Sequence, residues 1–172
     1  MDFRPIRRIK QQLTEEQIDT VLKEKVFGTL AMTGDGGYPY CIPLHFTYDK
    51  ERNLLYLHGA KQGHKIDAIR QNNKVCFNIL DDAEDTDARG NHYYHSIVIF
   101  GHMEIIDNEE EKMKDAWNLC AKFETPGEIE RHLHIEGGPV QMMLLHIDHM
   151  SGKRVLKEHF LTLAQRGMPE NS

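Results

Sequence analysis

The stretch Tyr38–Tyr48 limits the possible folds of this chain more than any other part of the sequence. Polar and apolar residues alternate along it, which is the period of a β-strand and not of a helix. One face carries Tyr40, Ile42, Leu44, Phe46 and Tyr48. The other face carries Cys41, Pro43, His45 and Thr47. Because proline cannot donate to a strand ladder, the two prolines indicate a sheet edge or a bulge that leaves backbone groups available to a ligand.

Five further apolar runs have the length and composition of strands, and they span residues 27–32, 54–58, 75–80, 97–106 and 140–147. A capping box at Thr14-Glu15-Glu16-Gln17 predicts a helix at 15–25, and Asn108 is the expected cap of a helix at 109–123. Further helices are expected at 66–71 and, as a short one, after Thr125-Pro126. On the helix at 109–123, the inward face is expected to carry Met113, Trp117, Cys120 and Phe123. Residues 81–90, with five carboxylates, are expected to form a solvated loop, and residues 151–153 a turn.

The short connections favour antiparallel pairing of these six strands, and therefore a closed or partly closed barrel. The expected fold is mainly β, of the α+β class, with flanking helices. No repeat or linker divides the 172 residues, which predicts one domain over 1–172. Residues 1–12 form a basic N-terminal arm, lying over the domain or a partner or simply solvated, and residues 154–172 form a C-terminal tail.

Composition narrows the classes of function. The net charge of −6, from 21 basic and 27 acidic residues, argues against a general nucleic-acid binder. No apolar run is long enough to span a membrane, and the first residues lack the apolar region of a signal peptide. Three scattered cysteines, Cys41, Cys76 and Cys120, support neither a disulfide framework nor a cysteine zinc site. We therefore expect a cytoplasmic protein.

The turn between the run at 54–58 and the helix at 66–71 has the composition of a phosphate-binding site. Its sequence is His58-Gly59-Ala60-Lys61-Gln62-Gly63-His64-Lys65. Glycine lets a ligand approach the backbone, a helix start offers free N–H groups, and lysine adds positive charge. The same residues, considered alone, also fit a solvated turn.

The eleven histidines raise the alternative of a metal centre. Close pairs in the sequence are His92 with His95, His132 with His134, and His146 with His149. Metal sites normally need a third ligand, and neither an HExxH motif nor a signature of two histidines and one carboxylate is present. The sequence therefore predicts no metal site, while haem binding stays open as an alternative.

Several short motifs follow one another in a specific order. They are Phe27-Gly28-Thr29-Leu30-Ala31, Gly37-Tyr38-Pro39-Tyr40-x-x-Pro43-Leu44, Leu57-His58-Gly59-Ala60-x-x-Gly63-x-Lys65, Tyr94-x-Ser96-x-Val98-x-Phe100-Gly101 and Ser151-Gly152-Lys153. In order and spacing, the chain resembles the pyridoxamine 5′-phosphate oxidase-like split-barrel flavoproteins, and most closely their Nim-type nitroimidazole-resistance branch. The resemblance extends from about Arg7 to Lys153, which is nearly the whole chain.

This resemblance implies a six-stranded antiparallel split β-barrel that binds FMN at a homodimer interface. The FMN phosphate would lie at Gly63, His64 and Lys65. The isoalloxazine ring would be lined by Pro43, Leu44, His45 and Phe46. The residues under the ring and ribityl chain would be Leu57, His58, Gly59 and Ala60. A flavin-facing strand, of this chain or of the partner, would contribute Tyr94, Ser96 and Val98.

The implied function is that of an FMN-dependent oxidoreductase that takes electrons from a reduced nicotinamide. It would reduce a small oxidised acceptor, nitroaromatic or quinone-like, with His58 as the proton donor. The tail from Arg154 to Glu158 lacks the arginine-rich segment of the vitamin enzyme, which disfavours a true pyridoxamine-phosphate oxidase. The alternative from another class is a non-catalytic flavin- or haem-binding carrier or sensor.

Overall fold

The structure is a computed structural model, and it describes residues 3–131 and 140–157. The strands in these ranges are β1 (Phe27–Thr33), β2 (Pro39–Asp49), β3 (Leu54–Ala60), β4 (Lys74–Thr86), β5 (His92–Ile106) and β6 (Val140–Leu156). The helices are η1 (Ile9–Gln11), α1 (Glu15–Glu24), η2 (Asp35–Gly37), α2 (His64–Gln71), α3 (Glu109–Cys120) and α4 (Pro126–Arg131). None of the helices within these ranges is long and apolar enough to cross a membrane.

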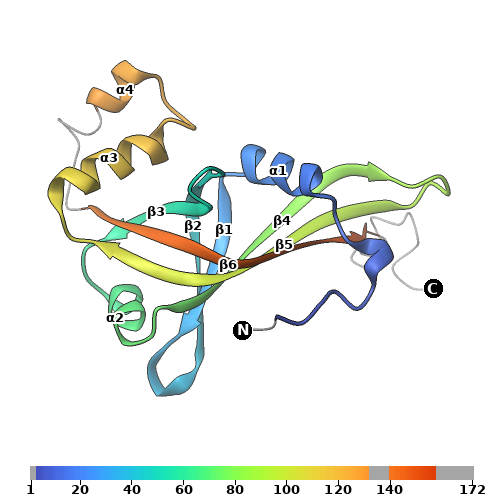
Figure 1. Ribbon diagram of the computed structural model, residues 1–172, viewed down its shortest axis with the longest axis horizontal. Helices are drawn as coiled ribbons and strands as arrows, with labels where there is room; N and C mark the ends of the chain where they lie inside the picture. Colours follow the sequence, from blue (N-terminus) through green and yellow to red (C-terminus); the bar gives the residue numbers. More distant parts are fainter. Residues whose placement is uncertain (1–2, 132–139, 158–172) are drawn as a thin grey trace, which may run out of the picture.

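The strands close an antiparallel barrel in the order β1-β2-β3-β6-β5-β4 (Figure 1). The alternation of β2 is as the sequence predicts, since Phe46 is fully buried while Cys41 and Pro43 are exposed. Apolar side chains from every strand meet in one core cluster, to which α1 adds Val21 and Leu22. The expected mainly β barrel with flanking helices is therefore confirmed.

The barrel is split between β2 and β3. The first part of β2 pairs only with β1, from Thr33↔Pro39 to Phe27↔His45. Its pairing with β3 begins at Phe46↔Leu57 and ends at Asp49↔Leu54. Within the described ranges, Pro39–His45 and His58–Ala60 therefore face each other without a ladder, and Pro43 lies at this edge as expected for proline.

Local sequence signals decide where the helices begin. The Thr14 hydroxyl accepts from the Gln17 N–H (3.2 Å) and the Gln17 side chain accepts from the Thr14 N–H (2.9 Å), which completes a capping box for α1. Asn108 caps α3 by accepting from the N–H groups of Glu110 and Glu111. α4 begins at Pro126, directly after Thr125, as predicted.

Two segments that the sequence analysis expects to be irregular are strands. β4 continues through the acidic residues to Thr86, so only the stretch after it forms the turn. The carboxylates tolerate this because long-range partners neutralise them, as Lys25 does for Asp81. Likewise β6 runs through Ser151–Lys153, with Gly152 paired to Ile97 and packed under Leu13.

The inward face of α3 also differs from the expectation. The helix ends at Cys120 and not at Phe123 as expected, so Phe123 lies beyond it. Met113 and Phe123 are exposed by 41% and 42%, whereas Asp115 and Leu119 are buried. Leu119 packs on the outer face of β3 and β6, where a second apolar cluster includes Tyr56. The helix is rotated toward this cluster because Asp115 lies close to Arg52, an ion pair that the periodicity of apolar residues cannot reveal.

Candidate functional site

The predicted site residues gather around the split between β2 and β3, where α2 begins. β2 contributes its unpaired edge, β3 contributes His58, Gly59 and Ala60, and α2 contributes its first residues. α2 starts at His64, two residues earlier than expected, so the histidine and lysine of the turn belong to its first turn. The split thus places free strand-edge groups next to free helix-start groups, which few other positions in a barrel offer.

The start of α2 has backbone donors and no side chain to satisfy them. Gly63 is its N-cap, with φ 114° and ψ 174°, and makes no side-chain cap. This left-handed value suits glycine and is strained for other residues. The Gly63 carbonyl accepts from the N–H groups of Ile66 and Asp67, which are the first to be bonded within the helix. The N–H groups of His64 and Lys65 come before them and have no acceptor in the helix. Such donors at the positive end of a helix suit an anion.

Lys65 lies beside this helix start and is only partly exposed. A Cβ at Gly59 would overlap the Lys65 ammonium, so glycine at that position gives the lysine its room. Burial lowers the pKa of Lys65 below that of a free lysine. Within residues 3–131 and 140–157, no carboxylate pairs with this ammonium group, so its charge is available to a ligand.

His64 is oriented by aromatic stacking and by Asp35, whose carboxylate lies 3.6 Å from its Nε2. Its ring stacks on Tyr40, with centroids 4.1 Å apart and planes 18° apart. The Asp35 N–H donates to its Nε2 over a long 3.4 Å. Tyr40 and Asp35 are neighbours of the turn that the sequence does not reveal, because only the closure of the barrel brings the β1–β2 hairpin against α2.

His45 and His58 come from opposite sides of the split and lie close together. Their rings are nearly parallel, at 10°, with centroids 6.2 Å apart. Phe27 meets His45 edge-on at 3.9 Å, and the exposed Phe123 stacks on it at 5.8 Å. This arrangement forms a half-buried aromatic wall that includes two imidazoles.

Not every predicted site residue presents its side chain at the split. Phe46 and Leu57 have no exposed surface and pair with each other in the β2–β3 ladder, so their side chains belong to the core and not to the split. Leu44 is partly buried and packs against the same core. Ser96 and Val98 lie on the outer face of β5, which β6 separates from β3 on one side and β4 and β1 separate from β2 on the other. Tyr94, next to them, faces Lys157. One chain therefore does not bring the two groups of predicted residues together.

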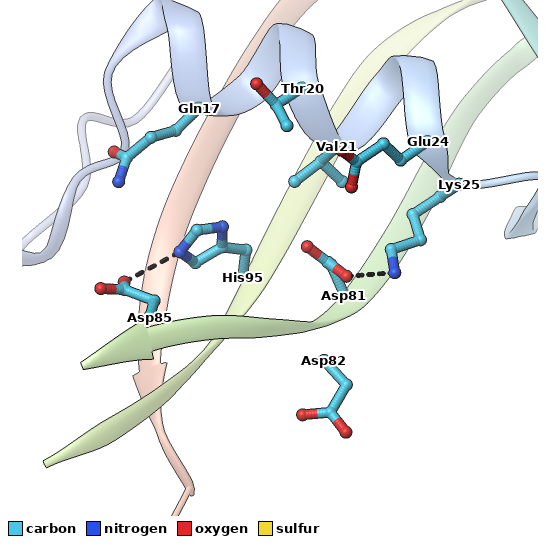
Figure 2. A pocket seen from close by; sticks show the side chains of 9 residues that line it. All are labelled: Gln17, Thr20, Val21, Glu24, Lys25, Asp81, Asp82, Asp85 and His95. Atoms are coloured by element: carbon cyan, nitrogen blue, oxygen red, sulfur yellow. Dashed lines mark hydrogen bonds and ion pairs between the residues drawn. The ribbon is translucent and has the colours of Figure 1, made fainter.

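A separate acidic cavity of about 470 Å³ lies between α1 and the β4–β5 hairpin, and Figure 2 shows its lining. Asp81 pairs there with Lys25, and Asp85 meets both His95 (2.9 Å) and Arg154 (2.6 Å). Among the described residues no group of three or more side chains is arranged to hold a metal ion. Of the histidine pairs noted in the sequence, His132 and His134 lie outside those residues.

The family of the chain follows from its sequence. Residues 14–154 match the model of the family described as pyridoxamine 5′-phosphate oxidase. The chain belongs to this family. Among curated proteins no match was found.

Solved structures similar to this pyridoxamine 5′-phosphate oxidase-family chain share its fold at low identity. A candidate 5-nitroimidazole antibiotic resistance protein from Bacteroides thetaiotaomicron is 20% identical, with a TM-score of 0.67 over 83% of this chain and 86% of that one. The FAD and heme binding protein from Mycobacterium smegmatis is 20% identical, with a TM-score of 0.61 over 83% of this chain and 72% of that one. The flavocytochrome Anf3 from Azotobacter vinelandii is 17% identical, with a TM-score of 0.63 over 96% and 79%.

Within the pyridoxamine 5′-phosphate oxidase-family match lie the split, the turn at 58–65 and the flavin-facing strand that the resemblance implies. The arm before residue 14 lies outside it. The family resemblance, with its Nim-type neighbour, is therefore confirmed.

Proposed function

We propose that this chain is an FMN-dependent oxidoreductase that uses a reduced nicotinamide to reduce a small nitroaromatic or quinone-like acceptor. One observation carries the proposal. At the split, an uncapped helix start and the unpaired, partly buried Lys65 converge beside an open strand edge. A phosphate group fits this combination of backbone donors and positive charge.

The rest of the split suits the planar part of a flavin. Between Pro39 and His45 the edge of β2 has backbone groups without strand partners, which can bond the polar rim of an isoalloxazine ring. His45, His58 and Phe123 supply a wall against which a ring can stack. The residues present thus fit both ends of FMN, and the FAD-binding and flavocytochrome neighbours support a flavin.

When bound, a flavin supplies hydride and electron transfer, chemistry that no side chain can perform. The role of the chain is to orient the ring, to shield it from water and to deliver protons. His58 is the proposed proton donor, because it is half-buried at the end of β3 and lies beside His45, through which a proton can be replaced. The flavin-facing residues Ser96 and Val98 would then come from a partner chain.

We propose a homodimer for this reason. The outer face formed by β1, β4 and β5 carries large apolar side chains, with Phe27 exposed by 56%, Leu80 by 64% and Phe100 by 40%. Exposed apolar residues gathered on one face are typical of an interface. Sedimentation should give a dimer whose dissociation releases flavin, and a monomer that holds flavin tightly would contradict a shared site.

A visible absorption spectrum of the purified protein, with the mass of whatever denaturation releases, tests the cofactor directly. Flavin bands and the mass of FMN are expected, followed by bleaching when NADH or NADPH is added without oxygen. A Soret band would replace the proposal with haem binding. A flavin that no nicotinamide reduces would favour the carrier alternative.

Replacing Lys65 by alanine tests the phosphate site. We expect FMN affinity to fall by about 1.5–3 kcal/mol, because a charge-assisted contact is lost. Arg70→Ala is the matched control, since Arg70 is an exposed cation on the same helix, in its last turn. Fluorescence titration of apoprotein with FMN measures both. Equal affinities of the two variants would remove Lys65 from the site.

A further inference from the structure

The N-terminal arm and the outer face of β5 and β6 enclose a groove of about 540 Å³. The arm runs alongside the second half of β6 (Figure 1). At one end Phe3 stacks on His149, with centroids 4.7 Å apart. At the other end the Leu13 N–H donates to the Gly152 carbonyl (2.9 Å), and Gln12 forms a bridge with Lys153. Both ends of the arm are thus anchored, which holds its middle over the sheet.

Three cations line this groove, namely Arg7, Arg8 and Lys153, and no acidic side chain does. In the part of the chain that the structure describes, none of the three forms an ion pair with a carboxylate. Single exposed cations are ordinarily just solvated, but the convergence of three on one cavity is notable in a chain of net charge −6. The groove is therefore a local positive site on an acidic protein.

Two hydroxyl groups, those of Ser96 and Ser151, add hydrogen-bonding capacity to the same groove. Asn78 donates to the Ser96 oxygen from its side-chain amide (3.3 Å) and donates also to the Ile97 carbonyl (2.9 Å). Because Asn78 fills an acceptor position of the hydroxyl, the Ser96 proton is free to point toward a ligand. An anion with several oxygens can use both hydroxyls and the planar forks of the arginines.

We propose that this groove binds the diphosphate of an adenosine dinucleotide, an inference that rests on the proposed flavin function. A diphosphate offers two negative charges and many acceptor oxygens, which three cations and two hydroxyls match better than a single carboxylate would. The cavity is in the size range of small-molecule sites, about 300–1,000 Å³. Its apolar members, such as Val98 and Val155, can cover a ribose.

The position of the groove agrees with this assignment. Ser96 and Val98 belong both to the groove and to the strand that the proposed dimer brings against the flavin. A dinucleotide held here by its diphosphate can therefore extend toward the flavin ring. The diphosphate has two sources, namely NADH or NADPH as the second reactant and the adenylate half of FAD as the cofactor.

Titration calorimetry of the full-length protein loaded with FMN, which has no adenylate half, tests the groove with ADP as the ligand. ADP should bind, and the double variant Arg7→Ala/Arg8→Ala should weaken it at least about tenfold, because charge-assisted contacts are lost. Arg4→Ala/Lys10→Ala is the matched control, since it removes two arm cations that do not line the groove and should change ADP affinity less than about twofold. No ADP binding, or an equal loss in both double variants, would overturn the proposal.

Retention of FMN separates this inference from the proposed function. The Arg7→Ala/Arg8→Ala variant should keep FMN, whereas Lys65→Ala should release it. If the arm variant loses FMN and keeps ADP, the groove belongs to the flavin phosphate and the proposal fails.

Two further measurements distinguish the sources of the diphosphate. A nicotinamide source predicts that the arm variant raises KM for NADH or NADPH at least about tenfold with kcat little changed. An adenylate source predicts that wild-type apoprotein prefers FAD over FMN, and that apoprotein of the Arg7→Ala/Arg8→Ala variant loses this preference.

Discussion

The acidic cavity beneath α1 and the basic groove beneath the N-terminal arm are similar in size, at about 470 and about 540 Å³, but their charges are satisfied in opposite ways. In the cavity, Asp81 pairs with Lys25 (Figure 2). Asp85 accepts two hydrogen bonds from the guanidinium of Arg154. In the groove, no carboxylate of the described residues pairs with the cations. The charges of the cavity are thus already paired within the protein, whereas those of the groove are available to an anion.

The contrast separates charges that stabilise the fold from charges that are available for binding. A buried carboxylate without a partner costs several kcal/mol, so those under α1 had to be paired for the barrel to close there. The arm cations are solvated and need no partner until a ligand displaces the water. Lys65 at the split is likewise available for binding, because no carboxylate of the described residues pairs with it, although it is partly buried. Substitutions should therefore reduce stability in one region and ligand affinity in the other.

The largest effect is expected from Lys25→Ala. Asp81 is only 5% exposed, and losing Lys25 would leave its carboxylate buried and unpaired. We expect the free energy of unfolding to fall by about 3–5 kcal/mol in urea denaturation. Lys23 is an exposed cation in the last turn of α1, and the control Lys23→Ala should cost less than about 0.5 kcal/mol. If both variants lose the same free energy of unfolding, the ion pair beneath α1 does not stabilise the fold.

A smaller loss, about 1.5–3 kcal/mol, is expected from Arg154→Ala, which removes two hydrogen bonds to Asp85. Burial acts to raise the pKa of Asp85, but hydrogen bonds from Arg154 and His95 lower it overall. A carboxyl whose pKa is lowered by folding stabilises the protein above its unfolded pKa of about 3.9, and this contribution is lost as the pH falls. The difference between wild type and variant should therefore shrink below about pH 4, and a constant difference would contradict the assignment.

Much of the fold could be predicted because its signals are local. The alternation in β2, the capping box of Thr14 and Gln17 and the Asn108 cap depend on neighbours within a few residues, and each is confirmed. The acidic part of β4 was missed because its strand pairing depends on cations far away in the sequence. The rotation of α3 was missed for the same reason, since Asp115 is buried against Arg52.

In the candidate site, too, local features could be predicted from the sequence and long-range ones could not. Glycine, histidine and lysine in the turn at 58–65 indicate a phosphate site from sequence alone, and Gly63 has the positive φ that such a turn uses. No spacing rule could reveal that β2 and β3 part at His45, or that His45 then lies beside His58. The core positions of Phe46 and Leu57 were equally hidden, because the same alternation fits a lining of the ring and a lining of the barrel.

The smallest effect is expected at Lys122, a cation that neutral groups satisfy. Its ammonium donates to the Leu22 carbonyl (3.0 Å) and the Lys25 carbonyl and lies over the Phe46 ring (4.6 Å). Burial lowers the pKa of Lys122 to about 8. Because the unfolded chain then binds this proton more tightly, stability should rise between pH 8 and about 10.4, by on the order of 1 kcal/mol after solvent screening. Subtracting the pH profile of stability of the Lys122→Met variant from that of the wild type isolates the contribution of Lys122. Parallel profiles would show that Lys122 is solvated like the cations of the groove.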